Sequence, residues 1–238
     1  MTRNRAVKFA LAGYAQANRV PVPAGFNPRS DGFGRQAFEL TKRVQAKAGL
    51  RPDGNIGPYT LLAIGKFMPG KSVGEKAAWC MVAMEGALET GGNNIGASVQ
   101  AIQKLGSELN PGAWPWCAAT TSWALRCAGW EHWGEFVRRE PEAWVQGWVD
   151  AAKAKKYGMS VVHWTLAKPG DFECFEFDGS YPVDHIGAIR SRPNLRTGSI
   201  LTVEGNTSDG QAGSQADGAG LWRRERNAKA PSVIVRVS

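Results

Sequence analysis

The sequence has little of what builds metal sites and disulfide frameworks. Its 238 residues include only four cysteines and three histidines. No two cysteines form a CxxC pair and no two histidines stand at the spacing of metal ligands, so a zinc site is not expected. A disulfide framework is not expected either, because a chain of this length can bury an ordinary core. We therefore predict no cofactor and no bound metal. The four cysteines are Cys80, Cys117, Cys127 and Cys174.

Long apolar runs are also absent, so no membrane-spanning helix is predicted. Hydrophobic residues make up 43% of the chain and charged residues 21%, as in an ordinary globular protein. The start of the chain faintly resembles a secretory signal peptide, with Arg3 and Arg5 before an apolar stretch that ends at residues 15–17. Lys8 and Gly13 interrupt that stretch, which also fits an amphipathic helix. We therefore expect no export signal, no membrane insertion and synthesis in a reducing cytoplasm.

Acidic residues are scarce in the N-terminal third, which carries the whole excess of positive charge. Residues 1–70 contain 11 basic and 3 acidic side chains, whereas residues 71–238 contain 18 of each. A basic segment joined to a neutral one predicts a polyanionic partner for the basic segment. Nucleic acid and anionic cell-wall polymer both fit this charge. Nucleic acid is the weaker candidate, because the segment lacks the alternating aromatic and basic residues that stack on bases.

Two turns in the N-terminal third resemble each other, and each comes before a predicted helix. Residues 31–34 read Asp-Gly-Phe-Gly and residues 53–57 read Asp-Gly-Asn-Ile-Gly, and Asp-Gly pairs are typical of tight turns. The helix after the first turn extends to about Ala48, and the helix after the second begins near Tyr59. With an earlier helix near residues 5–17, the pattern predicts a three-helix bundle of about 65 residues.

This bundle resembles the common peptidoglycan-binding domain of bacterial and phage wall hydrolases. The first turn is one residue shorter than in the family, and a valine stands where phenylalanine is more typical. The resemblance covers most of residues 1–67 and implies that the domain binds bacterial peptidoglycan; the alternative is a bundle with no ligand. The matching residues are the two turns, the pairs Val44-Gln45 and Gly49-Leu50, and Thr60.

Residues 68–76 contain glycine and proline and predict a linker to a second domain, residues 77–238. The pattern of the second domain is helical first and then alternating or β-branched. It predicts an α+β fold with a meandering antiparallel sheet. The predicted helices are residues 75–89, 95–105 and 117–128, and the predicted strands are residues 172–177, 185–190, 199–203 and 233–237.

Cys117 is the strongest candidate for chemistry, because it stands where a proline-containing loop gives way to a helical pattern. The N–H groups and the dipole at a helix N-terminus favour negative charge, and so favour the thiolate that attacks carbonyl carbon. The same N–H groups can stabilise the oxyanion of a tetrahedral intermediate. The alternative is a buried cysteine with a purely structural role, which is the usual place of a lone cysteine.

A thiolate needs an imidazole partner, and His185 is the histidine best placed to supply it. It opens a predicted strand, in which alternation places it on the same face as Gly187. The glycine leaves room for a close neighbour on that face. His132 and His163 lie in Trp-rich sequence and fit a surface or a core position equally well.

A third polar group is needed to hold the imidazole in the reactive tautomer. Glu204 and Asn206 stand two residues apart at the end of the next predicted strand, so they project to one side while the strand lasts. Antiparallel pairing with the strand of His185 would bring either side chain to the ring. The sequence leaves this choice open, and a solvated Glu204 at the strand end is the simpler alternative.

These segments together resemble the CHAP family, the cysteine, histidine-dependent amidohydrolases/peptidases of the papain-like superfamily. The resemblance covers about residues 75–238 and implies a papain-like fold with helices packed on an antiparallel sheet. The matching segments, in the family's order, are Trp116-Cys117-Ala118, Lys168-Pro169-Gly170-Asp171, Asp184-His185-Ile186-Gly187 and Glu204-Gly205-Asn206. Glu89, Asn93-Asn94, Leu221-Trp222-Arg223-Arg224 and Arg236 also fit.

The resemblance implies a role for each matching residue. Cys117 is the expected nucleophile, His185 the base and then the acid, and Glu204 the residue that orients His185, with Asn206 assisting. Some members bind calcium near the cysteine through closely spaced aspartates, and no such cluster precedes Cys117 here. A hydrolase with a peptidoglycan-binding domain and no export signal resembles a bacteriophage endolysin, a bacteriolytic enzyme made in the host cytoplasm that acts on the cell wall. We expect a monomer.

Three other interpretations stay open on the sequence alone. An NlpC-type endopeptidase would use the same thiol chemistry on a different stem-peptide bond. A glycosidase would use paired carboxylates, for which Glu85 and Glu89 are the candidates. A non-catalytic wall-binding protein would keep an inactive hydrolase fold. Even for an amidase or peptidase, the muramoyl–alanine bond, a stem-peptide bond and a cross-bridge bond all remain open.

Overall fold

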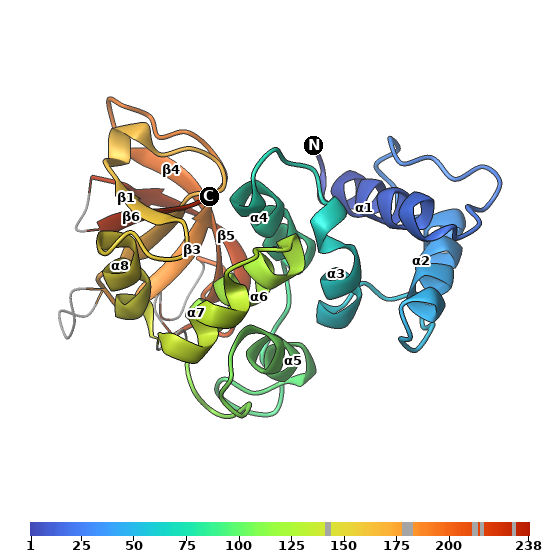
Figure 1. Cartoon of the computed structure of the whole chain (residues 1–238), viewed down its shortest axis with the longest axis horizontal. Helices are drawn as coiled ribbons and strands as arrows, with labels where there is room; N and C mark the ends of the chain where they lie inside the picture. Colours follow the sequence, from blue (N-terminus) through green and yellow to red (C-terminus); the bar gives the residue numbers. More distant parts are fainter. Residues whose placement is uncertain (141–143, 178–182, 211–213, 215–216, 230–231) are drawn as a thin grey trace.

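The computed structural model describes residues 1–140, 144–177, 183–210, 214, 217–229 and 232–238. These residues form an α+β structure, in which eight α-helices accompany one six-stranded antiparallel sheet. Figure 1 shows the N-terminal helices at one end of the molecule and the sheet at the other. Helices α4 (Val73–Ala83) and α6 (Cys117–Ala128) lie between them. The α+β prediction is therefore confirmed.

The N-terminal unit contains the three predicted helices. They are α1 (Arg3–Asn18), α2 (Arg35–Lys47) and α3 (Pro58–Ile64), followed by a 3-10 turn, η1 (Gly65–Phe67). The Thr2 hydroxyl caps α1 by accepting a hydrogen bond from the Arg5 N–H. Proline suits the first turn of α3, because its fixed φ is helical and its missing N–H is not needed there. No helix in the described part of the chain is both long and apolar enough to cross a bilayer.

Gln45 is buried in α2 and holds the second Asp-Gly turn against the bundle. Its amide nitrogen donates to Asp53 Oδ1 at 2.8 Å and to the Asn55 carbonyl at 2.8 Å. Its Oε1 accepts from the Gly54 N–H at 2.8 Å. A buried amide without such partners would cost about 1–3 kcal/mol. The glutamine of the Val44-Gln45 pair thus has a structural role that does not depend on any ligand.

The loop between α1 and α2 is organised around the ammonium group of Lys8. Lys8 is only 1% exposed, and its Nζ donates to the carbonyl oxygens of Asn27 at 3.0 Å and Gly32 at 2.9 Å. The carbonyl and hydroxyl oxygens of Ser30 are further acceptors. Because a buried cation needs such partners, the loop closes over the lysine. The residue that interrupts the apolar start of the sequence therefore belongs to the interior of the fold.

The second unit begins earlier than predicted, with α4. The Ser72 hydroxyl accepts from the Glu75 N–H at 3.1 Å, and the Glu75 carboxylate accepts from the Lys71 N–H at 2.6 Å. This arrangement is a capping box, which the spacing of Ser72 and Glu75 encodes. The predicted linker of residues 68–76 is therefore wrong at its end, because residues 73–76 are already helical. The predicted helix of residues 75–89 is also too long, since α4 ends at Ala83.

The other helices of this unit are α5 (Ala97–Gly106), α6, α7 (Trp133–Arg139) and α8 (Val145–Lys153). The predictions for α5 and α6 are confirmed within two residues, whereas α7 and α8 were not predicted. Aromatic packing holds these last two helices: the centroid of the Phe136 ring lies 4.8 Å from that of Trp148 and 5.4 Å from that of Trp130. Several tryptophans are thus core residues rather than ligand-binding ones.

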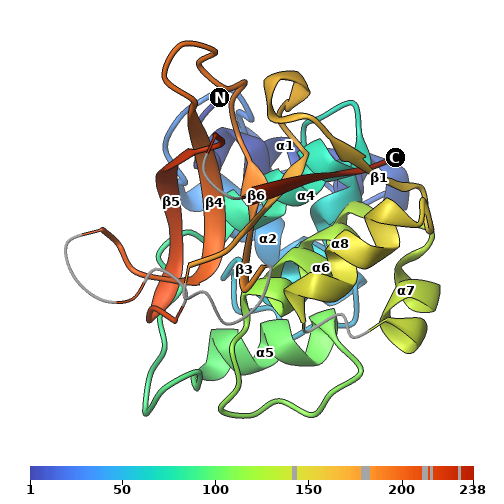
Figure 2. The same ribbon diagram turned by 90° about the vertical axis from the view of Figure 1, so that its left-hand side faces the viewer.

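The sheet has the strand order β1-β6-β2-β3-β4-β5, with every neighbouring pair antiparallel. In Figure 2 the sheet extends from β5 on the left to β1 on the right. Strands β2 to β4 form the predicted meander, which β5, a strand that was not predicted, extends. The predicted strand β6 departs from the meander by lying between β2 and β1, and β1 was not predicted either. The strands are β1 (Met159–Val162), β2 (Phe172–Phe175), β3 (His185–Ile189), β4 (Ser199–Thr207), β5 (Gly220–Asn227) and β6 (Ser232–Val237).

One hydrophobic core runs through both units, from α1 to the strands of the sheet. At the junction the indole N–H of Trp123, on α6, donates to the Pro58 carbonyl at 3.4 Å. Gly65 lies against Cys127, and a Cβ at Gly65 would stand 2.6 Å from the Cys127 carbonyl oxygen. A larger residue would therefore push η1 away from α6. The N-terminal unit is packed onto the second unit rather than merely tethered to it.

Replacing Lys8 by methionine should lower the free energy of unfolding by about 2–3 kcal/mol, because buried carbonyl oxygens lose a charged donor. Urea unfolding measures the difference. Lys47→Met is the matched control, since Lys47 is exposed on α2, and it should change the free energy by less than about 0.5 kcal/mol. Equal stability of Lys8→Met and the unmodified protein would show that the loop does not depend on the ammonium group.

Candidate active site

Cys117 is the first residue of α6, as the sequence predicts. It is 3% exposed. Trp116 is the N-cap residue, and among the described residues no side chain caps this helix. The first backbone bond of the helix comes from the Thr120 N–H, which donates to the Trp116 carbonyl at 2.9 Å. The N–H groups of residues 117–119 therefore have no acceptor within the helix.

His185 opens β3, is completely buried, and pairs with Glu204 of β4. Its Nε2 stands 3.1 Å from Glu204 Oε2. The sheet register explains the contact, because Glu204 lies directly opposite Gly187 and reaches across it to the ring. A Cβ at Gly187 would stand 2.3 Å from Glu204 Cγ. The prediction that this glycine leaves room for a close neighbour is therefore confirmed.

The Cys117 side chain lies close enough to the His185 ring to raise the pKa of the ring. Burial by itself would lower the pKa of His185, but the nearby side chains of Cys117 and Glu204 outweigh it and raise the pKa from 6.5 to about 9. Glu204 occupies Nε2, and the buried Nδ1 has no hydrogen-bond partner among the described residues. Nδ1 is therefore the nitrogen left for the thiol. A buried ring that holds its proton at neutral pH beside a cysteine supplies the imidazole partner that a cysteine nucleophile requires.

Glu204 is also held by Arg226, on the edge strand β5. Arg226 donates from Nε to Glu204 Oε1 at 2.9 Å and from Nη2 to Oε2 at 2.5 Å, and the Thr202 hydroxyl donates to Oε1. Burial would raise the pKa of Glu204, but the hydrogen bonds from Arg226 and His185 lower it from 4.5 to about 2. Such a bidentate guanidinium contact fixes the plane of the carboxylate as well as its charge.

Arg226 is the site residue that the sequence prediction missed. Its strand has a weak β signature, because residues 223–226 are all charged. The guanidinium also lies over two aromatic rings, 5.4 Å from the centroid of Phe175 and 5.0 Å from that of Phe177. These rings stack on each other and stand 6.1 and 5.6 Å from the His185 ring. Aromatic side chains thus shield the ion pairs from water.

Asn206 stands at an irregularity of β4 rather than in a regular strand. Its φ is +59°, and the register of β4 with β5 shifts between Glu204 and Thr207. Its side-chain amide donates to Asp217 Oδ1 at 3.3 Å. In the described part of the chain the side chain that accepts from the His185 ring is that of Glu204, not that of Asn206. The geometry thus selects between the two orienting candidates that the sequence left open.

Other polar residues singled out in the sequence have partners elsewhere. His132 pairs with Glu131 at 3.6 Å, and His163 Nδ1 lies 2.8 Å from the Thr165 hydroxyl. Arg236 holds Asp171 with two hydrogen bonds of 2.8 Å, which join β6 to the start of β2. Neither histidine contacts the His185 ring.

A second buried carboxylate, Glu173 of β2, lies opposite Gly187 on the other side from Glu204. Its Oε1 accepts from the Ser232 hydroxyl at 3.1 Å, and its Oε2 is buried with no hydrogen-bond partner among the described residues. Burial raises the pKa of Glu173 to about 7. The sheet thus holds an ionised carboxylate, Glu204, and a carboxyl group that readily keeps its proton, Glu173. Their pKa values differ because their environments differ.

Comparisons with protein-family models, curated proteins and solved structures give no match for this chain. What the site does is therefore argued from its geometry and chemistry.

Replacing Gly187 by alanine should separate Glu204 from His185, because the new methyl group would overlap Glu204 Cγ. The pKa of His185 should then fall from about 9 toward 6.5, and NMR titration of the ring protons measures it. Gly134→Ala is the control, since an added Cβ there meets only the flexible end of Arg138, at 3.4 Å. An unchanged pKa in Gly187→Ala would mean that Glu204 does not set the charge of the ring.

The free energy of unfolding should follow the shifted pKa values of the site. His185 binds its proton more tightly when folded, so its contribution is complete below pH 6.5 and is lost as the pH rises through 9. Glu204 binds its proton less tightly, so its contribution is complete above pH 4.5 and is lost as the pH falls through 2. Glu173, with its raised pKa, also lowers stability as the pH rises from 4.5 to 7. Stability should be greatest near about pH 5.

Urea unfolding between about pH 4 and 9.5 tests this profile. Glu204→Gln should lose about 3 kcal/mol near neutral pH, because it leaves a buried arginine and histidine without their counter-charge. Its stability should also fall less steeply between pH 6.5 and 9. Glu225→Gln, at an exposed position on β5, is the control and should keep the unmodified profile. Parallel profiles for Glu204→Gln and the control would contradict the assigned ion pair.

Proposed function

We propose that this chain is a peptidoglycan hydrolase that cleaves an amide bond of the bacterial cell wall, with Cys117 as the nucleophile. One observation carries the proposal: Cys117, at an uncapped helix N-terminus, acts on a buried His185 whose ring is held by Glu204. A thiol beside an imidazole that a buried carboxylate holds in place is the arrangement that enzymes use for acyl transfer.

In the first half-reaction the Cys117 thiolate attacks the amide carbonyl carbon. The carbon–sulfur bond forms, and the carbonyl oxygen takes the negative charge, which the first N–H groups of α6 stabilise. The intermediate then expels the amine, and the His185 imidazolium gives its proton to the leaving nitrogen. The products are a free amine and a thioester on Cys117.

In the second half-reaction the neutral His185 takes a proton from water as the water oxygen attacks the thioester. Collapse of this intermediate releases a carboxylic acid and restores the thiolate and the imidazolium. Glu204 acts through His185 as a positioning residue: its carboxylate fixes the ring and stabilises the charge that the ring carries at the start and the end. Arg226 in turn positions Glu204.

The choice of peptidoglycan as the substrate comes from the N-terminal unit. Residues 1–67 resemble a peptidoglycan-binding domain, and their excess of basic side chains suits an anionic wall. Helices packed on an antiparallel sheet are compatible with a papain-like CHAP domain in residues 77–238. Together these features support a phage endolysin, a monomer that works on the wall after synthesis in the host cytoplasm.

The positions of Glu85 and Glu89 do not favour the glycosidase alternative. Glu85 is paired with Arg223 at 2.5 Å, and Glu89 accepts a hydrogen bond from the Trp116 indole at 2.9 Å. Each carboxylate is thus engaged by a different partner, whereas a glycosidase needs two that face one sugar. An NlpC-type endopeptidase would share the thiol chemistry and differ only in the bond that is cut.

Cys117→Ala should abolish lysis of purified cell walls, by about three orders of magnitude or more, while binding to the walls remains. Turbidity measures lysis, and co-sedimentation with walls measures binding. Mass spectrometry of the fragments should show new amine and carboxyl ends and identify the bond. Cys174→Ala is the matched control, because Cys174 is also buried and burial raises the pKa of its thiol. It should keep activity within about threefold.

Lysis by Cys117→Ala at the original rate would refute the nucleophile, and release of reducing sugars with no new amine ends would favour a glycosidase. His185→Ala should be as inactive as Cys117→Ala. If the unmodified protein binds walls from several bacteria and hydrolyses none of them, the protein is a non-catalytic wall-binding protein.

A further inference from the structure

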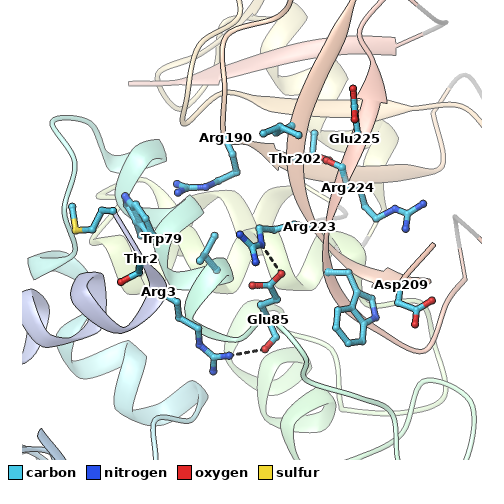
Figure 3. A pocket seen from close by; sticks show the side chains of 14 residues that line it. Thr2, Arg3, Trp79, Glu85, Arg190, Thr202, Asp209, Arg223, Arg224 and Glu225 are labelled. Atoms are coloured by element: carbon cyan, nitrogen blue, oxygen red, sulfur yellow. Dashed lines mark hydrogen bonds and ion pairs between the residues drawn. The ribbon is translucent and has the colours of Figure 1, made fainter. Parts of the chain in front are cut away.

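A cavity of about 860 Å³ lies between the N-terminal end of the chain, helix α4 and the sheet edge formed by β4 and β5. Figure 3 shows its wall, where arginine side chains from distant parts of the sequence lie among three acidic residues, Glu85, Asp209 and Glu225, and where Arg3 and Arg223 reach Glu85. Two tryptophans add flat apolar surface. The residues that matter here are Arg3, Arg190, Arg223, Arg224, Trp79 and Trp222. None of them has a role in the chemistry proposed above.

Carboxylates in the wall of the cavity already have partners. Glu85 is paired with Arg223, with 2.5 Å between Oε1 and Nε. Glu225 accepts a hydrogen bond from the Ser199 hydroxyl. Arg3 reaches Glu85 only through the backbone, since its Nη1 donates to the Glu85 carbonyl at 2.9 Å. The guanidinium groups of Arg3 and Arg223 therefore both reach Glu85, and that of Arg190 lines the same cavity.

Arg190 is the clearest sign of a ligand, because the nearby carboxylate of Glu75 acts on it only through its charge and forms no ion pair with it. Its guanidinium lies 4.0 Å from the centroid of the Trp79 ring, and no hydrogen bond or ion pair engages the side chain in the described part of the chain. Burial, and then the nearby charge of Arg223, lower the pKa of Arg190 from 12.5 to about 10. Gathering like charges in a half-buried place is unfavourable unless an anion enters. The aromatic ring holds the guanidinium in position with its hydrogen-bonding edge unused.

We propose that this cavity is a second binding site, which takes the carboxylate groups of a short acidic peptide. Guanidinium forks match carboxylates in shape and charge, and the indoles of Trp79 and Trp222 suit the apolar parts of a peptide. A volume of about 860 Å³ is that of a site for a small ligand rather than for a single ion. The identity of the natural ligand rests on the proposed function: it is a peptidoglycan stem peptide other than the one being cut.

The cavity adjoins the strand that carries the active site. Thr202 lines the cavity, and its hydroxyl donates to the Glu204 carboxylate. Met1, Thr2 and Arg3 line the cavity as well, so the basic N-terminal unit and the sheet share this surface. A stem peptide held here would fix the wall against both units at once, which raises the local concentration of amide bonds near Cys117.

Isothermal titration calorimetry on the full-length Cys117→Ala chain tests the proposal, with triglutamate as the probe. Trialanine amide is the uncharged probe, and inorganic pyrophosphate is the probe for a phosphate site. Triglutamate should bind, and its affinity should fall as salt is raised. Arg190→Gln should weaken binding by about tenfold or more. Arg192→Gln removes the same charge at an exposed position outside the cavity and should change affinity by less than about twofold.

The proposal fails if triglutamate does not bind, if trialanine amide binds equally well, or if Arg190→Gln binds like the Arg192→Gln control. It also fails if pyrophosphate binds and triglutamate does not. Arg190→Lys keeps the charge and loses the fork, so it covers the case in which Arg190→Gln does not fold; its affinity should also fall. Calorimetry does not depend on hydrolysis, so a protein that fails to lyse walls could still bind triglutamate in the cavity. Conversely, a failure to bind triglutamate would not change the result of the lysis assay.

Discussion

The buried ion pair between His185 and Glu204 is the interaction on which the rest of the site depends. Two charges removed from water are destabilising by several kcal/mol each unless each has close partners. Arg226, Thr202 and the two phenylalanine rings supply those partners, and Gly187 supplies the space. The edge strand β5 is therefore part of the active site, although none of its residues touches the thiol in the proposed reaction.

The same pair bears on the role proposed for the buried Cys117. Cys117 is shielded from solvent at the start of α6, beside the His185 ring. In the proposed reaction the helix N-terminus and the protonated ring would stabilise the negative charges that form beside them, and both are fixed before any substrate arrives. Catalysis of this kind depends on charges that are arranged in advance rather than on groups that move during the reaction.

The continuous core distinguishes the N-terminal unit from a module that is joined only by a flexible linker. A flexible linker would raise the local concentration of enzyme on the wall and leave its orientation free. Here α3 and η1 pack on α6, the helix that carries Cys117 at its other end. If the N-terminal unit binds the wall as proposed, the bound polymer would therefore meet the proposed active site in a fixed orientation. The arginine cavity lies along the same junction and would add to that constraint.

The sequence by itself determined the elements whose signals are local. The Asp-Gly turns, the helix that begins at Cys117 and the strands of His185 and Glu204 follow from turn chemistry and periodicity, and the spacing of Ser72 and Glu75 likewise encodes the start of α4. Only the tertiary structure decided which residues meet. The choice of Glu204 over Asn206 depends on a strand irregularity, and the roles of Arg226 and Arg190 depend on a charged edge strand and on contacts between distant segments. Periodicity indicates which face of its own helix or strand a residue occupies. Which elements pair with each other depends on packing between distant segments, so it cannot be read from a single stretch of sequence.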